Sequence, residues 1–231
     1  YDRAALRLTE AERARLEAEG RRPHWRFRLD HRRLGWEDGA LGPVEIDLAS
    51  LSDPVLIRED GRFLYALCSV VDDAEFGVTD VVRGADHVAN TAQQLQMFAA
   101  LGAAPPRFAH HSLMTAPGGA ALSKREGALS IEALRAEGVE PEAVVGLLAA
   151  LGTGREAVPT SVEAAARDFD LAAFGAAPVV FDPEQLRRLS AQSLRGADFD
   201  AVADRLAALG IEGPKAPAFW AAVRPNLDRL A

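Results

Sequence analysis

A short apolar run at residues 78–82, Val-Thr-Asp-Val-Val, is the feature that most constrains the fold of this chain. Its β-branched residues predict a buried strand of the kind that parallel sheets contain. A helix is expected next, beginning at Asn90 or Thr91 and ending at Gly102. A further strand is expected around residues 108–113. Strand, helix and strand in this order predict an α/β unit.

The residues ahead of this run predict a smaller α+β module. A capping-box pattern at Thr9 predicts the start of a helix. Residues 25–29 and 44–48 alternate between apolar and polar side chains, which is typical of strands, and Glu-Asp-Gly-Arg at 59–62 predicts a hairpin turn. Residues 1–60 are therefore expected to be rich in strands.

The second half of the chain predicts helices alone. Ser130 and Asp182 are expected to cap helices, and Pro141 is expected to open another. Two more helices are expected at residues 198–209 and 216–230. Glycine and proline separate these segments, so everything from Ser130 onward is expected to be helical.

Composition indicates a soluble globular protein, with 48% hydrophobic and 26% charged residues among 231. The single cysteine, Cys68, excludes a disulfide framework and a cysteine-rich zinc site, and it is expected to be buried within an apolar run. No apolar stretch is long enough to span a bilayer, and no signal peptide opens the sequence. Together these features predict a cytoplasmic protein.

The net charge of −8 argues against a nucleic-acid-binding protein. Arginines are concentrated in the first segment, however, so a basic face is compatible with an acidic chain. Charge alone favours the simpler interpretation, a solvated arginine-rich surface. The arginines concerned are Arg3, Arg7, Arg13, Arg15, Arg21, Arg22, Arg26, Arg28, Arg32 and Arg33.

Two local patterns point to chemistry. The first is Ser123-Lys124-Arg125, which follows a Gly-Gly pair; a lysine on such a loop can clamp a polyphosphate, although an exposed basic turn has the same pattern. The second is Arg83, at the carboxyl end of the predicted strand, where open α/β sheets bind their ligands. Its guanidinium can hold a carboxylate through two parallel hydrogen bonds, and the alternative is a structural salt bridge with a neighbouring aspartate, Asp72 or Asp73.

These patterns and their neighbours closely resemble the bacterial glutamyl-tRNA synthetases, which are class I aminoacyl-tRNA synthetases. The resemblance covers most of the chain, and its motifs occur in the order that the family shows. They are Tyr65, Val-Val-Asp-Asp at 70–73, the segment 77–83, Asp86-His87, Asn90-Thr91, Gln94, Phe-Ala-His at 108–110, Leu-Ser-Lys-Arg at 122–125, Glu-Gly-Val-Glu-Pro-Glu-Ala at 137–143 and Phe-Asp-Pro-Glu-Gln-Leu at 181–186.

The resemblance implies a fold that combines α/β and all-α parts. Residues 1–60 would be the tail of an α+β insertion that binds the tRNA acceptor stem. Residues 61–127 would complete a Rossmann-like nucleotide-binding domain, and residues 128–200 would form a helical stem-contact domain. Residues 201–231 would begin the helical anticodon-binding region.

The resemblance also implies the site. The catalytic residues would be Ser123, Lys124 and Arg125. The glutamate-binding residues would be Arg83, Tyr65 and Ser69. The ATP-binding residues would be Lys124, Asp86, His87, Leu113 and Met114.

The implied activity is ATP-dependent ligation of glutamate to tRNA through a glutamyl-adenylate. Substrate-bound Mg²⁺ would accompany ATP, and no protein-bound zinc is expected. The implied partners are glutamate and tRNA(Glu), with tRNA(Gln) left open, and neither DNA nor a membrane; the family expectation is a monomer.

Several features depart from the family pattern. Ala121, Ser69 and Ala85 stand where the family usually has lysine, asparagine and an acidic residue. The family's H-[IL]-G-H motif, whose histidines stabilise the phosphates of ATP, occurs nowhere in the 231 residues. The expectation is therefore an internal fragment that is inactive in isolation.

Two alternatives remain open. One is the paralogue that glutamylates a modified tRNA base, although that group lacks the long helical extension. The other is a non-catalytic tRNA-binding module derived from a synthetase.

Overall fold

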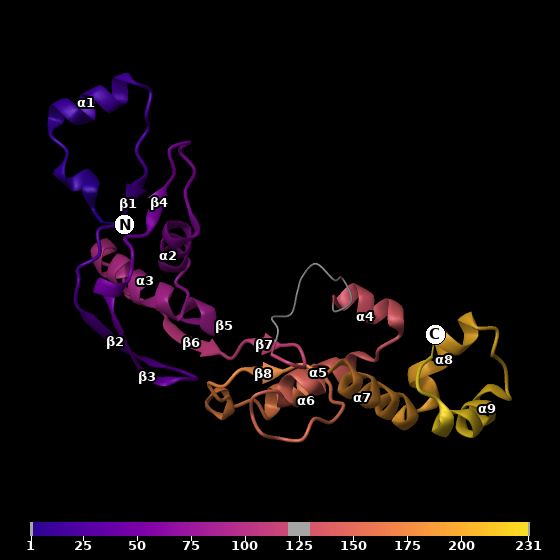
Figure 1. Cartoon of the computed structure of the whole chain (residues 1–231). Helices are drawn as coiled ribbons and strands as arrows, with labels where there is room; N and C mark the ends of the chain where they lie inside the picture. The colour runs from indigo at the N-terminus through magenta and orange to yellow at the C-terminus, as the bar shows by residue number, and fades with distance from the viewer. Residues whose placement is uncertain (1, 120–129, 231) are drawn as a thin grey trace. The chain divides into compact units, whose positions relative to one another are not determined.

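The computed structural model describes residues 2–119 and 130–230, which fall into two compact units (Figure 1). Unit 1 comprises Tyr1–His111 and unit 2 comprises Ser112–Ala231. The Ser-Lys-Arg loop at 123–125 and Ala121 lie outside the described residues.

In its described residues, unit 1 combines three helices with three pairs of strands. Its helices are α1 (Glu10–Ala18), α2 (Tyr65–Glu75) and α3 (Val88–Leu101), with short 3-10 turns at Ala4–Arg7, Leu48–Ser50 and Ala85–His87. Its strands are β1 (Trp25–Arg26), β2 (Arg33–Asp38), β3 (Gly42–Asp47), β4 (Val55–Ile57), β5 (Asp80–Gly84) and β6 (Arg107–His111). The pairs β1–β4 and β2–β3 are antiparallel, whereas β5–β6 is parallel.

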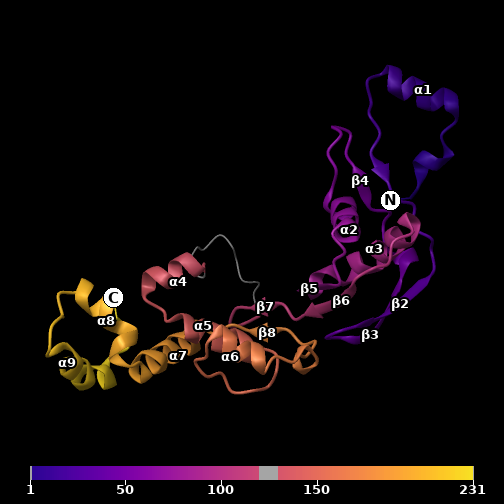
Figure 2. The same cartoon turned by 180° about the vertical axis from the view of Figure 1, so that it is seen from behind.

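The core of unit 1 lies between α2, α3 and the parallel pair (Figure 2). Val70 of α2, Met97 and Phe98 of α3 and Phe108 of β6 form one buried cluster. A second cluster joins α3, through Ala92, to the residues around the β2–β3 hairpin. The hairpin and the parallel pair are thereby held against the same helix.

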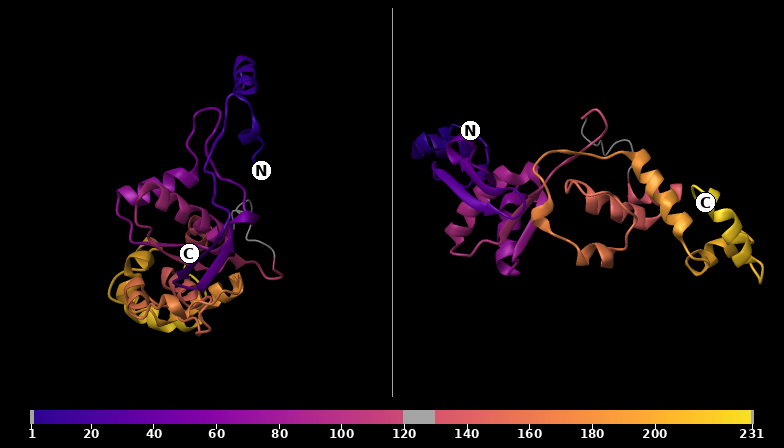
Figure 3. Two further views of the ribbon diagram at one scale, coloured as in Figure 1. Left: turned by 90° about the vertical axis from the view of Figure 1, so that its left-hand side faces the viewer. Right: turned by 90° about the horizontal axis from the view of Figure 1, so that it is seen from below.

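Helix α1 contributes no buried residue to unit 1, and the left view in Figure 3 shows it (indigo) apart from the rest of that unit. Its start is fixed locally, because the Thr9 side chain accepts from the Glu12 backbone N–H while the Glu12 carboxylate accepts from the Thr9 backbone N–H. The predicted capping box is confirmed.

Some predictions for unit 1 were wrong. Strand β5 is not a fully buried strand: Val82 is 56% exposed, because β5 has only β6 beside it among the described residues. Helix α3 begins at Val88, since the 3-10 turn at Ala85–His87 leads directly into it. Thr91 therefore lies buried within the helix and does not cap it.

Unit 2 is mainly helical. Its helices are α4 (Ile131–Glu137), α5 (Pro141–Ala150), α6 (Val162–Arg167), α7 (Pro183–Gly196), α8 (Phe199–Ala208) and α9 (Ala216–Val223), with 3-10 turns at Leu171–Ala173 and Arg224–Asn226. Two short strands, β7 (Met114–Thr115) and β8 (Val179–Val180), pair in parallel.

Among the described residues of unit 2, two buried clusters join its helices. Leu134, Leu147, Leu186 and Leu189 join α4 and α5 to the first half of α7. Leu194, near the end of α7, packs instead with α8 and α9, which lie beyond that end of α7 in Figures 1 and 3 (yellow). Helix α7 thus takes part in both clusters.

The predicted caps of Ser130 and Asp182 are confirmed, since each side chain accepts a backbone N–H of the first helical turn. The prediction that everything after Ser130 is helical was wrong, because β8 lies there and pairs with β7. Helix α9 also ends at Val223, well before residue 230. Pro225, which has no backbone N–H to continue an α-helix, lies just beyond that end.

Candidate active site

Arg83 lies near the carboxyl end of β5, directly across from His110 of β6 in the strand register. Residues in register on parallel neighbours point to the same face of the sheet. The Arg83 guanidinium also lies over the Phe108 ring, with its central carbon 5.1 Å from the ring centroid. The parallel pair therefore positions the arginine and the histidine together.

The Arg83 guanidinium donates four hydrogen bonds to uncharged side chains. Nη1 donates to the Tyr65 hydroxyl over 2.9 Å, and Nε donates to His110 Nε2 over 3.3 Å. Nη2 donates to Thr91 Oγ1 over 2.6 Å and to Gln94 Oε1 over 2.7 Å. Because a guanidinium carries five N–H donors, one Nη1 hydrogen has no acceptor among the described residues.

Ser69 joins this network one step further out. The Gln94 amide holds Arg83 with its oxygen and donates from Nε2 to Ser69 Oγ over 2.7 Å. The structure therefore brings Arg83, Tyr65 and Ser69, the three residues predicted to bind glutamate, into one hydrogen-bonded group.

No ion pair with a carboxylate involves Arg83 in the described part of the chain. The structural salt bridge to Asp72 or Asp73, the alternative left open by the sequence, is accordingly not seen there. Burial raises the pKa of the Asp73 carboxyl, while the positive charge of Arg83 works in the opposite direction. The cation is thus near a carboxyl group without being in contact with it.

A buried pair, Asp38 and His110, lies behind Arg83, and both side chains are 0% exposed. Asp38 Oδ2 lies 2.5 Å from His110 Nδ1, and Asp38 Oδ1 accepts the His110 backbone N–H over 2.9 Å. Burial alone would raise the pKa of Asp38, but hydrogen bonds from His110 and from the backbone of Leu41 and Ala40 lower it to about 2. Asp38 is therefore ionised at neutral pH.

Of the residues predicted to bind ATP, Asp86 and His87 belong to the same unit as Arg83. Asp86 and His87 lie in the turn after β5, and the His87 ring meets the Tyr65 ring edge-on at 5.7 Å between centroids. His87 Nδ1 is buried without a hydrogen-bond partner in the described residues. Leu113 and Met114 belong to unit 2, where both are exposed, and Ser123, Lys124 and Arg125 lie outside the described residues.

Cys68 is exposed, so the prediction that it is buried was wrong. It lies on α2, where the core-facing residues are others, including the fully buried Val70. An apolar run on a helix cannot all face one side, because successive side chains are about 100° apart.

The described residues contain no grouping of three histidine, cysteine or acidic side chains that could hold a metal ion. In the same part of the chain, no helix is both long and apolar enough to cross a bilayer.

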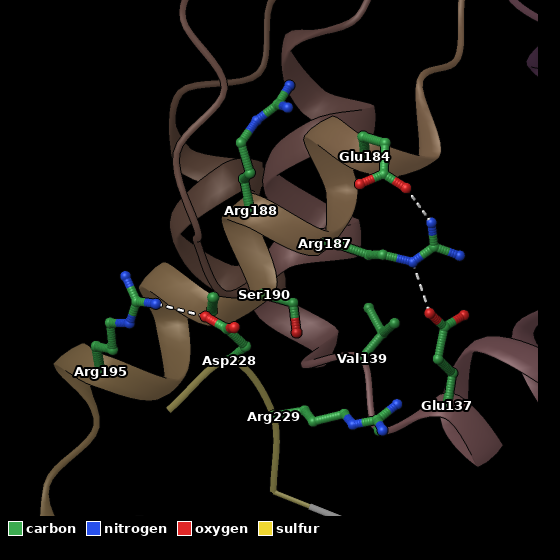
Figure 4. Close-up of a pocket in the computed structure, with 11 residues that line it drawn as sticks. Glu137, Val139, Glu184, Arg187, Arg188, Ser190, Arg195, Asp228 and Arg229 are labelled. Carbon is green, nitrogen blue, oxygen red and sulfur yellow. Dashed lines mark hydrogen bonds and ion pairs between the residues drawn. The ribbon is translucent and has the colours of Figure 1, made fainter. Parts of the chain in front are cut away.

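Unit 2 has a separate cavity of about 770 Å³ between α4, α7 and the chain end (Figure 4). Arginines surround it, but Arg187 is paired with Glu137 and Glu184, and Arg195 is paired with Asp228. Its walls therefore carry mixed charge. None of the described residues predicted for catalysis or for substrate binding lines it.

Sequence reasoning gave no functional role to Asp38 or to His110. His110 stands within the Phe-Ala-His segment that carried the family resemblance, and that position was the available signal. Asp38 lies 72 residues away in the chain, within a different pair of strands. Local sequence gave no sign of their contact.

Comparison with known proteins places this chain in a family. The model of "tRNA synthetases class I (E and Q), catalytic domain" matches residues 1–187. The glutamate–tRNA ligase 2 of Xanthobacter autotrophicus is 59% identical over 233 residues, an alignment that covers 100% of this chain and 50% of the relative. The glutamate–tRNA ligase 2 of Methylorubrum populi is 56% identical, with 100% and 52% covered.

Solved structures agree with the sequence relatives. A glutamate tRNA ligase from Elizabethkingia meningosepticum, solved in complex with its amino acid, superposes with a TM-score of 0.81 at 25% identity, covering 98% of this chain and 50% of that one. The glutamate-tRNA synthetase of Elizabethkingia anophelis gives the same TM-score and identity, with 98% and 51% covered. The chain spans about half the length of the curated relatives it matches. It belongs to the class I (E and Q) tRNA synthetases, and residues 1–187 match their catalytic domain.

Proposed function

We propose that this chain is the part of a glutamate–tRNA ligase that binds the side-chain carboxylate of glutamate through Arg83. The observation that carries the proposal is the set of hydrogen-bond partners of the Arg83 guanidinium. The guanidinium is held in place by four uncharged acceptors and has no carboxylate partner among the described residues. A fixed cation without an internal counter-ion is suited to an anionic ligand.

Tyr65 supports the same assignment. Its hydroxyl accepts a hydrogen bond from Arg83 Nη1 and keeps its own O–H to donate, and the Tyr65 residue is 51% exposed. A carboxylate could then accept from the remaining Nη1 hydrogen and from the tyrosine hydroxyl. Glutamine, whose side-chain amide is neutral, would lose the charge attraction, so the site would prefer glutamate.

The proposed reaction has two steps. An oxygen of the glutamate α-carboxylate attacks the α-phosphorus of ATP, which enters with its Mg²⁺, and pyrophosphate leaves. The terminal ribose hydroxyl of tRNA(Glu) then attacks the activated carbonyl carbon, and AMP leaves. Neither step needs a covalent protein nucleophile, so the protein contributes positioning and charge stabilisation.

Other parts of the chain receive proposed roles from the family. Ser123, Lys124 and Arg125 would stabilise the charge that develops at the phosphates. Asp86, His87, Leu113 and Met114 would contact ATP. Residues 1–60 and the helices from residue 128 onward would contact tRNA, and tRNA(Gln) is the second acceptor to test. The proposed protein is a cytoplasmic monomer.

Binding of glutamate to the 231-residue chain tests the proposal directly. L-Glutamate and L-glutamine are titrated into the chain labelled with ¹⁵N in its arginine side chains, and the Arg83 Nε–H signal is followed by NMR. We expect a saturable shift with glutamate and at least about tenfold weaker binding of glutamine, since hydrogen bonds to charged groups contribute about 1.5–3 kcal/mol.

Arg83→Gln should abolish glutamate binding. Arg107→Gln is the matched control, because Arg107 lies on the adjacent strand and is exposed and paired with Asp80. The control should bind glutamate as the wild type does. Equal binding of glutamate and glutamine, or undiminished binding by Arg83→Gln, would exclude the proposed role of Arg83.

A further inference from the structure

The Nε edge of Arg83 is oriented by His110, whose ring is completely buried. For Arg83 Nε to donate there, His110 Nε2 must present a lone pair. In a neutral imidazole only one nitrogen carries a proton, so the proton must then be on Nδ1. Which nitrogen of the buried His110 ring carries the proton thus decides whether Arg83 Nε has an acceptor.

Asp38 selects that position. Its carboxylate can only accept hydrogen bonds, and Oδ2 lies 2.5 Å from His110 Nδ1, so the ring proton faces Asp38. Asp38 is itself fixed by the Ala40 and Leu41 backbone N–H groups, each 3.1 Å from Oδ1, and by the Trp36 indole N–H, 3.3 Å from Oδ2. It cannot turn away without breaking several bonds at once.

Thr91 connects Arg83 Nη2 with His110 Nε2. Its hydroxyl accepts from Arg83 Nη2 over 2.6 Å and lies 2.9 Å from His110 Nε2, to which it can donate. A hydroxyl can donate or accept, so the Thr91 contact is compatible with a lone pair on Nε2. The contacts of Asp38 and Arg83 specify the tautomer, and Thr91 fits it.

We propose that Asp38 and His110 are positioning residues that hold Arg83 for the substrate carboxylate, and this proposal rests on the proposed function of Arg83. A carboxylate in direct contact with Arg83 Nε would pair with the cation and compete with the ligand. A neutral imidazole accepts the hydrogen bond without a negative charge of its own, and it keeps the Asp38 charge one ring away. The guanidinium plane is fixed while its positive charge stays available on the Tyr65 side.

The first test needs no ligand. In the chain labelled with ¹⁵N at histidine and arginine, NMR shifts should show His110 protonated at Nδ1 and unprotonated at Nε2. The Arg83 Nε–H should exchange slowly with water. Asp38→Asn, which can present an amide N–H to the ring, should move the proton to Nε2 and speed that exchange at least about tenfold.

The second test measures glutamate binding in a double-mutant cycle. His110→Asn can keep a donor near the Nδ1 position but has no acceptor at Nε2, so it should raise the Kd for glutamate about tenfold or more. The same substitution in an Arg83→Lys chain, which keeps the positive charge but has no guanidinium Nε–H for His110 to accept, should have little further effect on binding. A merely structural role would lower stability equally in both backgrounds and would not give this coupling.

Asp80→Asn is the matched control, because it removes an exposed carboxylate from the same strand as Arg83. It should leave the His110 tautomer and glutamate affinity unchanged.

If Asp38→Asn does not fold, His110→Asn and Thr91→Val test the same network. Wild-type glutamate affinity in a folded His110→Asn chain, or a His110 proton on Nε2 in the wild type, would overturn the positioning role. Failure of the wild type to bind glutamate would instead count against the proposed function.

Discussion

The buried Asp38 carboxylate accepts hydrogen bonds from Trp36, Ala40, Leu41 and His110, and its ionisation has a consequence for stability. Its pKa is lowered from 3.8 to about 2 in the folded chain. Between about pH 4 and pH 2 the unfolded chain binds more protons at this group, so the unfolding free energy falls as the pH falls. The stabilisation is complete above that range and amounts to about 2 kcal/mol.

We therefore expect Asp38→Asn to be less stable than the wild type at pH 7, with a difference that shrinks by about 2 kcal/mol towards pH 2. Urea unfolding at several pH values, followed by ¹⁹F NMR of fluorotryptophan, measures this, since Trp36 reports on unit 1. Glu45→Gln, which removes an exposed carboxylate from the same hairpin, should change stability little. A difference that stays constant from pH 7 to pH 2 would contradict the prediction.

At the residue scale, the sequence predicted Arg83, Tyr65 and Ser69 but not the Asp38–His110 pair behind Arg83. Arg83, Tyr65 and Ser69 were predicted because they belong to motifs that occur in a fixed order. The contact between Asp38 and His110 depends on how a hairpin turn packs against β6, where the Gly39 backbone N–H also donates to the Phe108 carbonyl. Such a contact depends on tertiary packing, which local sequence does not encode.

Among the elements, α5 is packed more closely than its sequence suggests. A Cβ atom added at Gly146 would lie 1.9 Å from the Val158 carbonyl oxygen and 2.7 Å from its carbon. Backbone atoms cannot rotate away as a side chain can. We expect Gly146→Ala to destabilise unit 2 by about 3 kcal/mol or more. Urea unfolding followed by ¹⁹F NMR of Trp220 measures the loss.

Gly196, at the end of α7, provides the matched control. A Cβ added there meets no atom within 4 Å. Gly196→Ala should therefore be neutral or stabilise by up to about 1 kcal/mol, because alanine loses less conformational entropy on folding. Similar effects of the two substitutions would show that α5 does not approach residues 158–159 as closely as described.

Helix α1 should depend on its cap rather than on packing, since it buries no residue. Thr9→Ala removes the side chain that accepts from the Glu12 N–H, at a cost of about 1 kcal/mol to the helix. Amide hydrogen exchange within α1 should become about fivefold faster, while α2 and α3 stay unchanged. Thr9→Ser keeps the hydroxyl and should match the wild type; equal exchange in Thr9→Ala would mean that the cap contributes nothing.

Prediction of elements from sequence succeeded where the signal is local. Ser130 and Asp182 cap helices through groups within three residues of themselves, so their neighbours in the sequence suffice. The pairing of β7 with β8 joins two-residue strands some 65 positions apart, and no periodicity marks so short a strand. Local chemistry therefore predicted most helix starts, and the nonlocal parallel pair was missed.

For the whole chain, substrate binding and chemistry should be separable. Adenylate formation needs charge stabilisation at the phosphates, and the loss of a single donor can slow such a step by about 10²–10³-fold. The 231 residues contain no H-[IL]-G-H sequence, the motif that the family resemblance assigns to the ATP phosphates. We therefore expect the purified chain to bind glutamate but to catalyse no measurable glutamate-dependent exchange of labelled pyrophosphate into ATP.

A full-length relative such as the Xanthobacter autotrophicus ligase serves as the positive control for this assay. Exchange by the 231-residue chain that requires glutamate and disappears in Lys124→Ala would contradict the prediction, because it would mean that Lys124 and the residues around Arg83 suffice for adenylation. Glutamate binding without exchange would instead assign the carboxylate site to this chain and the missing charge stabilisation to residues that its sequence does not contain.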